Sequence, residues 1–367
     1  MSTQFHGILF AYRDNPHLQQ LTSHRTVASI PFGGRYRMID FMLSNMVNAG
    51  IIDIGVVMQK KCQSLLDHLG SGKDWDLARK RGGLRVLPPF SASHDFRGKM
   101  EALYGVYSYL TEIKQDYVVM ADGDVACNID LEPVFKAHLE SGADITAVCT
   151  SQLTGDPTLS TYFKIGDNGR ITDVLDGPNA AAGYESLKVY ILSTKKLIEL
   201  VDYCASHNLY SFTADILIPM RDKLDIRPYF YDGYVARLTT VASYYARSME
   251  LLRSDVEMDI FNQEHPIRTK DRSDPSTYLA ADSHVTHSLV ADGCIIEGTV
   301  EDCVIFRGVK VGKDAIVRNC VLMQDTVIEE GANIRNVITD KNVTIKAHRA
   351  LSGHSSYPLC IDKGCII

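Results

Sequence analysis

The sequence lacks the long apolar and charged runs that mark several classes of protein. No stretch approaches the roughly 18 consecutive apolar residues of a membrane-spanning helix, and the first residues do not pair a basic segment with an apolar one, as a secretory leader does. The net charge of −7 is spread without acidic or basic blocks, which argues against a phosphate-neutralising patch for nucleic acids. We therefore expect a cytoplasmic protein that binds neither membranes nor nucleic acids, and whose partner is a small molecule or another protein.

Paired cysteine motifs are also absent. The nine cysteines lie between Cys62 and Cys365 without CxxC spacing. In a cytoplasmic chain, cysteines scattered in this way are expected to be buried thiols. Cys360 and Cys365 stand close together, but a disulfide or zinc site there is the weaker interpretation.

Short apolar segments and amphipathic segments alternate through the first 250 residues of a chain long enough for two domains. This alternation predicts an α/β domain, residues 1–257, with an open and mostly parallel sheet. Expected strands are residues 7–11, 53–58, 116–120, 144–150 and 188–192, and expected helices are residues 39–49, 62–69, 101–112 and 131–141. Asp122 and Asp124 follow the third of these strands, where open α/β sheets bind ligands.

A polar segment with two prolines, residues 258–284, predicts a linker. In residues 285–367, apolar or small residues recur at intervals of five or six from Leu289 to Val343. Such hexapeptide repetition predicts a C-terminal left-handed parallel β-helix. The alternative, a β-sandwich, would need turn signals every 8 to 12 residues or so. Because a β-helix ends in open strand edges, we also expect oligomers, with self-association as one possibility.

Motifs along most of the chain carry a family resemblance. Residues 31–41 read Pro-Phe-Gly-Gly-Arg-Tyr-Arg-Met-Ile-Asp-Phe, and further matching segments are Ser44-Asn45, Asn48-Ala49-Gly50-Ile51, Trp75-Asp76-Leu77, Gly82-Gly83, Leu87-Pro88-Pro89 and Pro266-Ile267-Arg268-Thr269. These segments strongly resemble the ADP-glucose pyrophosphorylase (glucose-1-phosphate adenylyltransferase) family. The resemblance implies a Rossmann-like, GT-A-like nucleotidyltransferase domain followed by the β-helix. It also implies a reaction in which glucose 1-phosphate attacks the α-phosphorus of ATP while magnesium neutralises the pyrophosphate.

The loop after the first strand lacks glycine. Active family members have Gly-Gly-x-Gly there, so that backbone amides approach the triphosphate closely. In this chain Tyr12, Arg13 and Asn15 stand at the three glycine positions. The resemblance therefore implies a degenerate nucleotide pocket. Its expected members are Tyr12, Arg13, Asn15, Gln59, Gly82, Gly83, Asp122, Asp124 and Arg237.

The family's two magnesium-binding aspartates are reduced to one. The resemblance maps the first ligand onto Asp124 and the second onto Arg237, and a cation does not coordinate a cation. We expect no metal and no cofactor in this chain, with Mg²⁺ confined to a catalytic partner. One hypothesis is that Arg237 pairs with Asp124 in place of the metal; the alternative is that Asp124 only caps a turn.

The implied sugar pocket is altered in the same way. Gly177 stands where the family has the lysine that neutralises the sugar phosphate, and Lys164 and Lys188 stand where it has glycines. The degenerate sugar pocket comprises Lys164, Asp176, Gly177, Ser186 and Lys188. Either the two lysines reflect drift on an unused surface, or they fill the pocket or hold another phosphate.

A basic group near the family motif is a candidate effector site. Positions matching His24, Arg25, Arg35 and Arg37 contribute in the family to a site for sugar-phosphate effectors between the domains, and arginine suits phosphate recognition. We expect the last turn of the β-helix to add Lys346, His348 and Arg349. The alternatives are solvated charges, structural ion pairs or a subunit contact.

A retained framework with a degraded site resembles the GlgD-type subunit of this family. The resemblance implies a poorly catalytic or non-catalytic regulatory subunit of glycogen biosynthesis, joined to a catalytic glucose-1-phosphate adenylyltransferase subunit in a hetero-tetramer. One rival is a competent nucleotidyltransferase that keeps Gln59, Gly82, Gly83 and Asp124 as nucleotide contacts. A remote rival is a hexapeptide-repeat acyltransferase using one of its histidines: His284, His287, His348 or His354.

Overall fold

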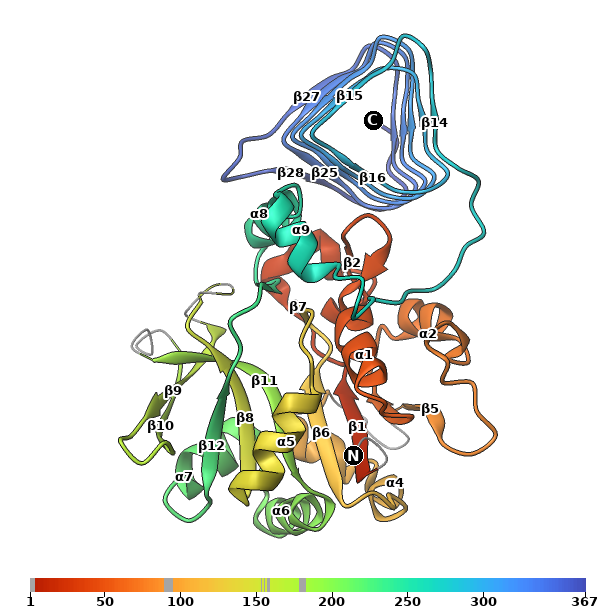
Figure 1. Ribbon diagram of the computed structural model, residues 1–367. Coiled ribbons are helices and arrows are strands. Elements are labelled where there is room, and N and C mark those ends of the chain that lie inside the picture. Colours follow the sequence, from red (N-terminus) through yellow and green to blue (C-terminus); the bar gives the residue numbers. More distant parts are fainter. Residues whose placement is uncertain (1–3, 89–94, 153, 155, 157–158, 178–182) are drawn as a thin grey trace.

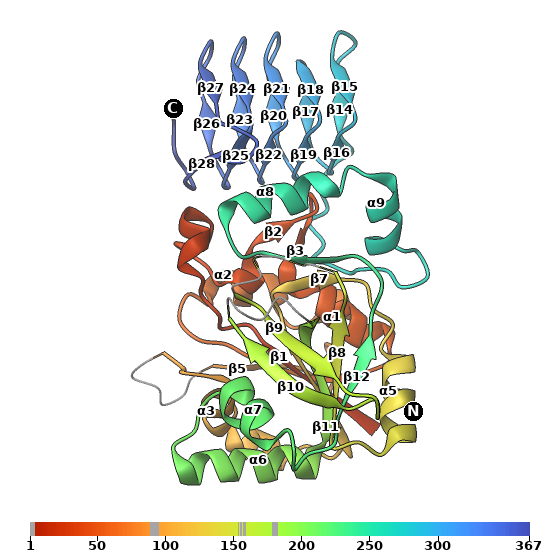
Figure 2. The same ribbon diagram turned by 90° about the vertical axis from the view of Figure 1, so that its left-hand side faces the viewer.

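The computed structural model describes residues 4–88, 95–152, 154, 156, 159–177 and 183–367. A mixed α/β domain carries a triangular β-helix on one end (Figure 1). The turned view shows the β-helix coils standing on helix α8, with the α/β domain beneath (Figure 2). The predicted fold class is confirmed for both halves of the chain.

A nine-stranded sheet forms the middle of the N-terminal domain. Its strands are β1 (Phe5–Phe10), β4 (Asp53–Val57), β5 (Gly83–Leu87), β6 (Tyr117–Asp122), β8 (Ile145–Thr150), β9 (Thr161–Ile165), β10 (Ile171–Asp176), β11 (Tyr184–Ser193) and β12 (Ile226–Phe230). Strands β6, β1, β4 and β5 are parallel neighbours in that order, whereas β11 runs antiparallel to β6, β8 and β9. The antiparallel β11 makes the sheet mixed, which the sequence pattern did not indicate.

Helices cover both faces of this sheet. They are α1 (Met38–Asn48), α2 (Gln63–Leu69), α3 (Lys99–Tyr104), α4 (Tyr107–Thr111), α5 (Glu132–Ser141), α6 (Thr194–His207) and α7 (Ile218–Met220). Ile8 and Leu9 of β1 belong to the two different cores, because successive side chains of a strand point to opposite faces. In the described part of the chain, no helix combines the length and apolar character needed to cross a bilayer.

The single helix expected at residues 101–112 is wrong. The chain forms α3 and α4 there, separated at Gly105 and Val106, and Val106 has non-helical backbone angles (φ −119°, ψ 29°). Glycine is a poor residue for a helix interior, so a break at this point fits its conformational entropy.

The C-terminal domain is built from three five-stranded parallel sheets, one on each side of a triangle. The first sheet holds β14 (Tyr278–Leu279), β17 (Ile295–Ile296), β20 (Lys310–Val311), β23 (Val327–Ile328) and β26 (Thr344–Ile345). The second holds β15 (His284–Thr286), β18 (Thr299–Glu301), β21 (Ile316–Arg318), β24 (Asn333–Arg335) and β27 (Ala350–Ser352). The third holds β16 (Leu289–Val290), β19 (Val304–Ile305), β22 (Val321–Leu322), β25 (Val337–Thr339) and β28 (Leu359–Ile361).

Equivalent positions stack from one coil to the next. Val311 pairs with Ile296 on one side and Ile328 on the other, and Ile328 pairs with Ile345. All four side chains are buried inside the triangle. A period of five or six residues therefore places one apolar residue on each side of every coil, and the β-sandwich alternative is wrong.

The segment that joins the domains is shorter than the expected linker of residues 258–284. Helix α9 (Ser254–Ile260) continues past residue 257, and β14 pairs with the β-helix from Tyr278 onward. Both ends of the expected linker belong to exposed helix or strand. Met258 in α9 and Tyr278 in β14 are both exposed.

The third sheet of the β-helix packs on the α/β domain through α8 (Val241–Glu250), α9 and the short hairpin of β2 (Pro31–Phe32) and β3 (Tyr36–Arg37). One apolar cluster spans the junction, with Phe32 and Tyr244 on one side and Phe306 and Ile338 on the other. A buried ion pair adds to it. Arg25 donates to both carboxylate oxygens of Asp340, at 2.8 and 2.7 Å, and both residues are less than 4 % exposed.

Breaking the buried pair is expected to loosen the whole domain junction. Asp340→Asn leaves the Arg25 charge without its partner, and we expect a loss of about 3–5 kcal/mol in unfolding free energy by denaturant titration. The matched control is the exposed interdomain pair of Arg35 and Asp292, 2.8 Å apart; Arg35→Met should cost less than about 1 kcal/mol. Equal losses in the two variants would show that the buried pair has no special role.

Candidate functional site

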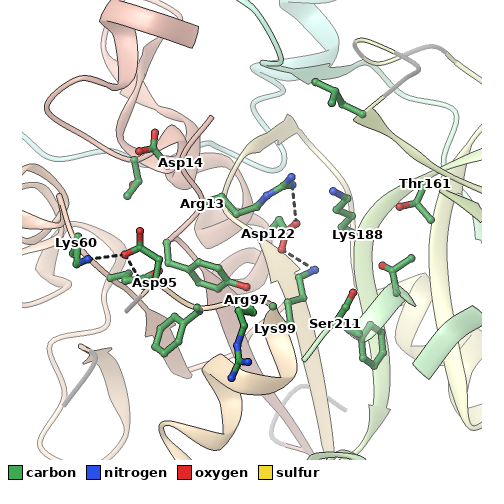
Figure 3. A pocket seen from close by; sticks show the side chains of 18 of the residues that line it. Arg13, Asp14, Lys60, Asp95, Arg97, Lys99, Asp122, Thr161, Lys188 and Ser211 are labelled. Carbon is green, nitrogen blue, oxygen red and sulfur yellow. Dashed lines mark hydrogen bonds and ion pairs between the residues drawn. The ribbon is translucent and has the colours of Figure 1, made fainter. Parts of the chain in front are cut away.

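A cavity of about 520 Å³ opens at the carboxyl edge of the parallel strands (Figure 3). Its walls come from the loop after β1, the segment after β4, the first turn of α3, the end of β6, and β11. This is the edge at which parallel α/β sheets bind ligands, and Asp122 ends the central strand β6 there, as expected. The cavity stays open although no glycine follows β1.

Arg13 occupies the cation position of this cavity. Its guanidinium lies 3.2 Å from Asp124 and 3.6 Å from Asp122, while Lys99 approaches Asp122 from the other side at 2.8 Å. Burial alone would raise the pKa of Asp122, but the charges of Lys99, Lys188 and Arg13 outweigh burial and lower that pKa. Both carboxylates are therefore paired with cationic side chains of the chain itself. This set does not fit a magnesium ion, because a guanidinium stands where the ion would bind.

Arg237 does not pair with Asp124, and that hypothesis is wrong. Strand β13 (Val235–Arg237) pairs with β7 (Val125–Cys127), and the Arg237 side chain turns toward β11. It donates to Glu185 at 3.1 Å and to the carbonyl of Ser186 at 3.0 Å.

Glu185 is the centre of a buried network. Besides Arg237, its carboxylate accepts hydrogen bonds from the backbone N–H of Thr154 at 2.9 Å and from the hydroxyl groups of Thr154 and Ser160 at 2.6 and 2.7 Å. Arg237 and Glu185 are 3 % and 1 % exposed. Arg237 is thus a structural cross-link, and Asp124 is held by Arg13 rather than only capping a turn.

The loop after β1 is fixed by its own side chains. The side-chain oxygen Oδ1 of Asn15 accepts from the His17 N–H at 3.0 Å, and its side-chain amide nitrogen donates to the Thr239 carbonyl at 2.8 Å. The ring of Tyr12 packs edge-on against Phe96 at 5.5 Å. These contacts occupy the space and polar groups that a glycine-rich loop would leave for a phosphate chain.

Two expected nucleotide contacts, Gly82 and Gly83, lie at the opposite edge of the sheet. Gly83 begins β5 and pairs with Asp53, the first residue of β4, so both glycines stand at the amino edge. Each has a positive φ, and a Cβ on Gly82 would meet the Asp53 carboxylate at 1.8 Å. Their role is to close this turn. Gln59 does line the cavity, where its amide donates to Asp95 at 3.1 Å.

At the sugar end, the structure separates the two lysines. Lys188 lines the cavity, as does Asp176, which accepts from Thr161 at 2.8 Å. Lys164 lies on β9, half exposed, 3.5 Å from Asp173, and is not part of the cavity. Gly177 follows β10 with φ +92°, Ser186 is hydrogen-bonded to Tyr190 at 3.1 Å, and Pro178 lies outside the described residues.

Lys188 is held in an unusual environment. Its backbone keeps a positive φ of 56°, the conformation that favours glycine. Burial, together with the nearby charges of Arg13 and Arg237, lowers the pKa of Lys188 to about 7. Among the described residues, no carboxylate forms an ion pair with its ammonium group, although Asp122 and Arg13 lie nearby.

The expected effector group divides in two. Arg35 and Arg37 line a cavity of about 140 Å³ between the domains, but Arg25 is locked to Asp340, and His24 is exposed outside the lining. The other cations around this cavity are Lys270, Arg272, Arg307 and Lys341. Burial, then Arg37 and Arg25, lowers the pKa of Lys341 to about 7, and burial lowers the pKa of Arg37 to about 10.

The expected contribution of Lys346, His348 and Arg349 is wrong. These residues form the corner between β26 and β27, which lies away from the α/β domain (Figure 1). Lys346 pairs there with Glu329 at 2.8 Å. The corner that does face the α/β domain supplies Arg307 and Lys341, because their coil positions bring them next to the β2–β3 hairpin.

Sequence reasoning missed Lys99 and Glu185. A signal existed for Lys99, since it stands in the segment Gly98-Lys99-Met100-Glu101-Ala102, where the resembling family has a Gly-Thr-Ala turn that encloses the nucleotide. No sequence motif marks Glu185. Its role as the acceptor of the buried network is evident only from its contact with Arg237.

Family comparisons agree with this architecture. A nucleotidyl transferase family profile matches residues 16–232, and a GlmU-like, C-terminal hexapeptide profile matches residues 276–354. The fold and cavity thus define a protein of the nucleotidyltransferase class.

The particular family follows from three relatives. Identity is 39 % to the glycogen biosynthesis protein GlgD of Bacillus subtilis (strain 168), over 95 % of this chain and 93 % of that protein. It is 36 % to the GlgD protein of Geobacillus stearothermophilus, over 86 % and 84 % of the two chains. It is 32 % to the glucose-1-phosphate adenylyltransferase of the same organism, over 85 % and 82 %. The chain belongs to the family of glucose-1-phosphate adenylyltransferases and GlgD proteins, as the motifs predicted.

Removing the two side-chain cations should restore a place for a metal ion. In Arg13→Ala/Lys99→Met, the carboxylates of Asp122 and Asp124 lack partners, so we expect lower thermal stability and recovery of stability on adding Mn²⁺. Recovery should reach about 2.7 kcal/mol at roughly 100-fold excess over the dissociation constant. Lys60→Met, at an exposed pair 3.1 Å from Asp95, is the control. Equal Mn²⁺ stabilisation of the unaltered chain would contradict the assignment of Arg13 as the cation of this site.

Proposed function

We propose that this chain is a non-catalytic regulatory subunit that assembles with a catalytic glucose-1-phosphate adenylyltransferase subunit in glycogen biosynthesis. One observation carries the proposal: the Arg13 guanidinium lies 3.2 Å from Asp124, in the place of a catalytic cation. Nucleotidyl transfer depends on a metal to neutralise the pyrophosphate leaving group. The Arg13 guanidinium is attached to the chain, so it cannot leave with pyrophosphate as a metal ion can. The loop that carries it has no glycine, so its backbone amides are not free to bind the phosphates.

The kept framework supports a role in assembly rather than in chemistry. Among the described residues, the two cores of the α/β domain, the domain junction and the β-helix each contain a cluster of buried apolar side chains. Unpaired strands end the β-helix at β14, where Tyr278 and Leu279 are both more than half exposed. An exposed apolar edge of this kind is a contact surface for a second subunit. The proposed partner is a chain of the kind that the relative named glucose-1-phosphate adenylyltransferase represents, whereas this chain is the proposed GlgD-type subunit.

The rival activities gain no support from specific contacts. A competent nucleotidyltransferase would need Gly82, Gly83 and a second metal ligand, which lie elsewhere or are replaced. An acyltransferase would need a histidine base in a cleft, whereas His287 binds Asp302 at 2.5 Å on an exposed turn and His354 binds Ser356 at 2.8 Å.

Assays of the separate and mixed subunits test the proposal. The purified chain with ATP, glucose 1-phosphate and Mg²⁺ should form no ADP-glucose above background. Mixed with a catalytic glucose-1-phosphate adenylyltransferase subunit, it should form a complex in sedimentation analysis and change the kcat or KM of that subunit. Full activity of the chain alone would overturn the proposal, and so would an unchanged partner with no complex.

We further propose that the interdomain cavity binds a phosphate-bearing effector. Arg35, Arg37, Arg307 and Lys341 converge on it from both domains, and burial has already lowered the pKa of Arg37 and Lys341. An anion between these groups would offset their repulsion and tie the β-helix to the α/β domain.

Inorganic phosphate or a sugar phosphate should therefore raise the melting temperature of the chain. Lys341→Met should abolish that rise, because it removes a cation from the cavity wall. Lys346→Met, on the far corner of the β-helix, should leave it unchanged. An equal rise in all three proteins would place the anion outside this cavity.

A further inference from the structure

A second large cavity, of about 630 Å³, lies at the amino edge of the parallel strands. Figure 1 shows this edge, where β1 begins, at the end of the α/β domain away from the β-helix. The cavity lies between the turn that leads into β5 and the turn between α4 and β6. This amino-edge cavity shares no lining residue with the cleft at the carboxyl edge or with the interdomain cavity.

The floor of the amino-edge cavity holds a buried histidine. His6 on β1 is 4 % exposed, and its Nε2 lies 2.7 Å from the hydroxyl oxygen of Tyr109. That hydroxyl group has no other hydrogen-bond partner among the described residues, so its hydrogen is donated to Nε2. The hydrogen of the neutral imidazole ring then lies on Nδ1, because only one ring nitrogen carries a hydrogen in that form.

The Nδ1–H group of His6 is an unused donor. Nδ1 has no hydrogen-bond partner among the described residues. Burial lowers the pKa of His6 to about 4, against the opposing effects of Asp53 and Gln115, so the ring is neutral near pH 7. The amide nitrogen of Gln115 donates to Asp53 at 2.7 Å. A buried donor without a partner costs free energy, which an oxygen atom of a ligand would recover.

The cations at the mouth of the cavity have no partners either. Lys80 and Arg81 stand on the β5 side and Lys114 stands on the α4 side, and all three are exposed. None of them forms an ion pair or hydrogen bond within the described part of the chain. The mouth therefore presents unpaired positive charge from two different elements.

The acidic groups of the cavity, in contrast, are occupied. Asp53 accepts from the backbone N–H of Gly83 at 2.9 Å, in addition to the amide of Gln115. Glu112 pairs with Arg85 at 3.2 Å. The charge that remains for a ligand is therefore positive.

The Gly82-Gly83 turn shapes the β5 wall. Both residues have a positive φ, and a Cβ on Gly83 would lie 2.2 Å from the carbonyl oxygen of Leu77. Glycine is thus required for a turn this close to neighbouring backbone. Lys80 and Arg81 immediately precede it, so the same turn fixes the chain that carries them at the mouth.

We propose that the amino-edge cavity binds a small organic dianion between Lys80 and Arg81 on one side and Lys114 on the other. Two anionic groups are needed because the unpaired cations belong to different walls, and both carboxylates and phosphates suit lysine and arginine. The Nδ1–H of His6 would donate to an oxygen atom on the body of the ligand, and Ile113 would contact its carbon atoms. The inference does not rest on the proposed regulatory function.

Calorimetry on the full chain tests this, at low ionic strength because salt screens exposed charges. The probes are succinate, 2,3-bisphosphoglycerate and succinamide, which is the neutral counterpart of succinate. We expect at least one dianion to bind and succinamide not to bind. Tighter binding of succinate would identify carboxylates as the preferred groups, and tighter binding of 2,3-bisphosphoglycerate would identify phosphates. Failure of both dianions to bind, or equal binding of succinamide, would overturn the proposal.

Variants of the mouth and the floor locate the site. Lys114→Met and Arg81→Met should each weaken binding about tenfold, which is the usual effect of losing one charged hydrogen bond. His6→Gln should weaken it to a similar degree, because the glutamine amide can still meet the Tyr109 hydroxyl but cannot replace Nδ1. Lys136→Met, on the exposed face of α5, should bind as the unaltered chain does. Circular dichroism checks that each variant is folded.

Two further variants exclude the other cavities. Lys341→Met removes a cation from the interdomain cavity, and Lys188→Gly removes one from the carboxyl-edge cleft. Both should keep the affinity of the unaltered chain. If either abolishes binding while Lys114→Met retains it, the dianion binds elsewhere and the inference is wrong. The mouth variants decide the matter even if the His6 variant does not fold.

Discussion

The carboxylate of Asp122 is the fixed point of this molecule's charge arrangement. It is 1 % exposed at the end of the central strand, and a buried charge is tolerated only when it is paired. In a metal-dependent enzyme a divalent ion satisfies that need. Here Lys99, from α3, and Arg13, from the β1 loop, do so.

At the domain junction, too, a buried charge is paired with an opposite charge. Arg25 is buried and paired with Asp340, while Arg37 and Lys341 are half-buried nearby and form no ion pair with a carboxylate among the described residues. The junction thus combines one closed ion pair with an open basic cavity. The apolar cluster of α8 and the third β-helix sheet holds the two domains together, and the basic cavity lies beside it.

Much of the fold could be predicted from local patterns. Period-two strands, helical spacing and the hexapeptide repeat depend on neighbouring residues, so β1, α1 and the β-helix follow from the sequence. The direction of β11 and the split between α3 and α4 depend on partners far away in the chain, which the pattern does not contain.

The site residues, too, could be predicted where local motifs place them and could not where distant contacts decide. The motifs predicted that Arg13 and Lys188 border the cleft, and both line the cavity. Each follows or lies within a strand that the sequence pattern also predicts. Long-range placement could not be predicted: the Arg237 side chain turns to Glu185, Gly82 lies at the opposite edge of the sheet, and Lys346 lies at the corner of the β-helix that faces away from the α/β domain. In each case a contact between residues more than 15 positions apart decided the outcome.

The buried pair of Arg237 and Glu185 makes position 237 difficult to change on its own. Restoring an aspartate at position 237 alone would set two carboxylates side by side in a dry interior, and would release the hydrogen bonds that fasten Thr154 and Ser160. A first step in either direction is therefore harmful unless position 185 changes with it. Position 237 and position 185 are therefore coupled, so that either one is constrained by the other whatever residues stand elsewhere in the cleft.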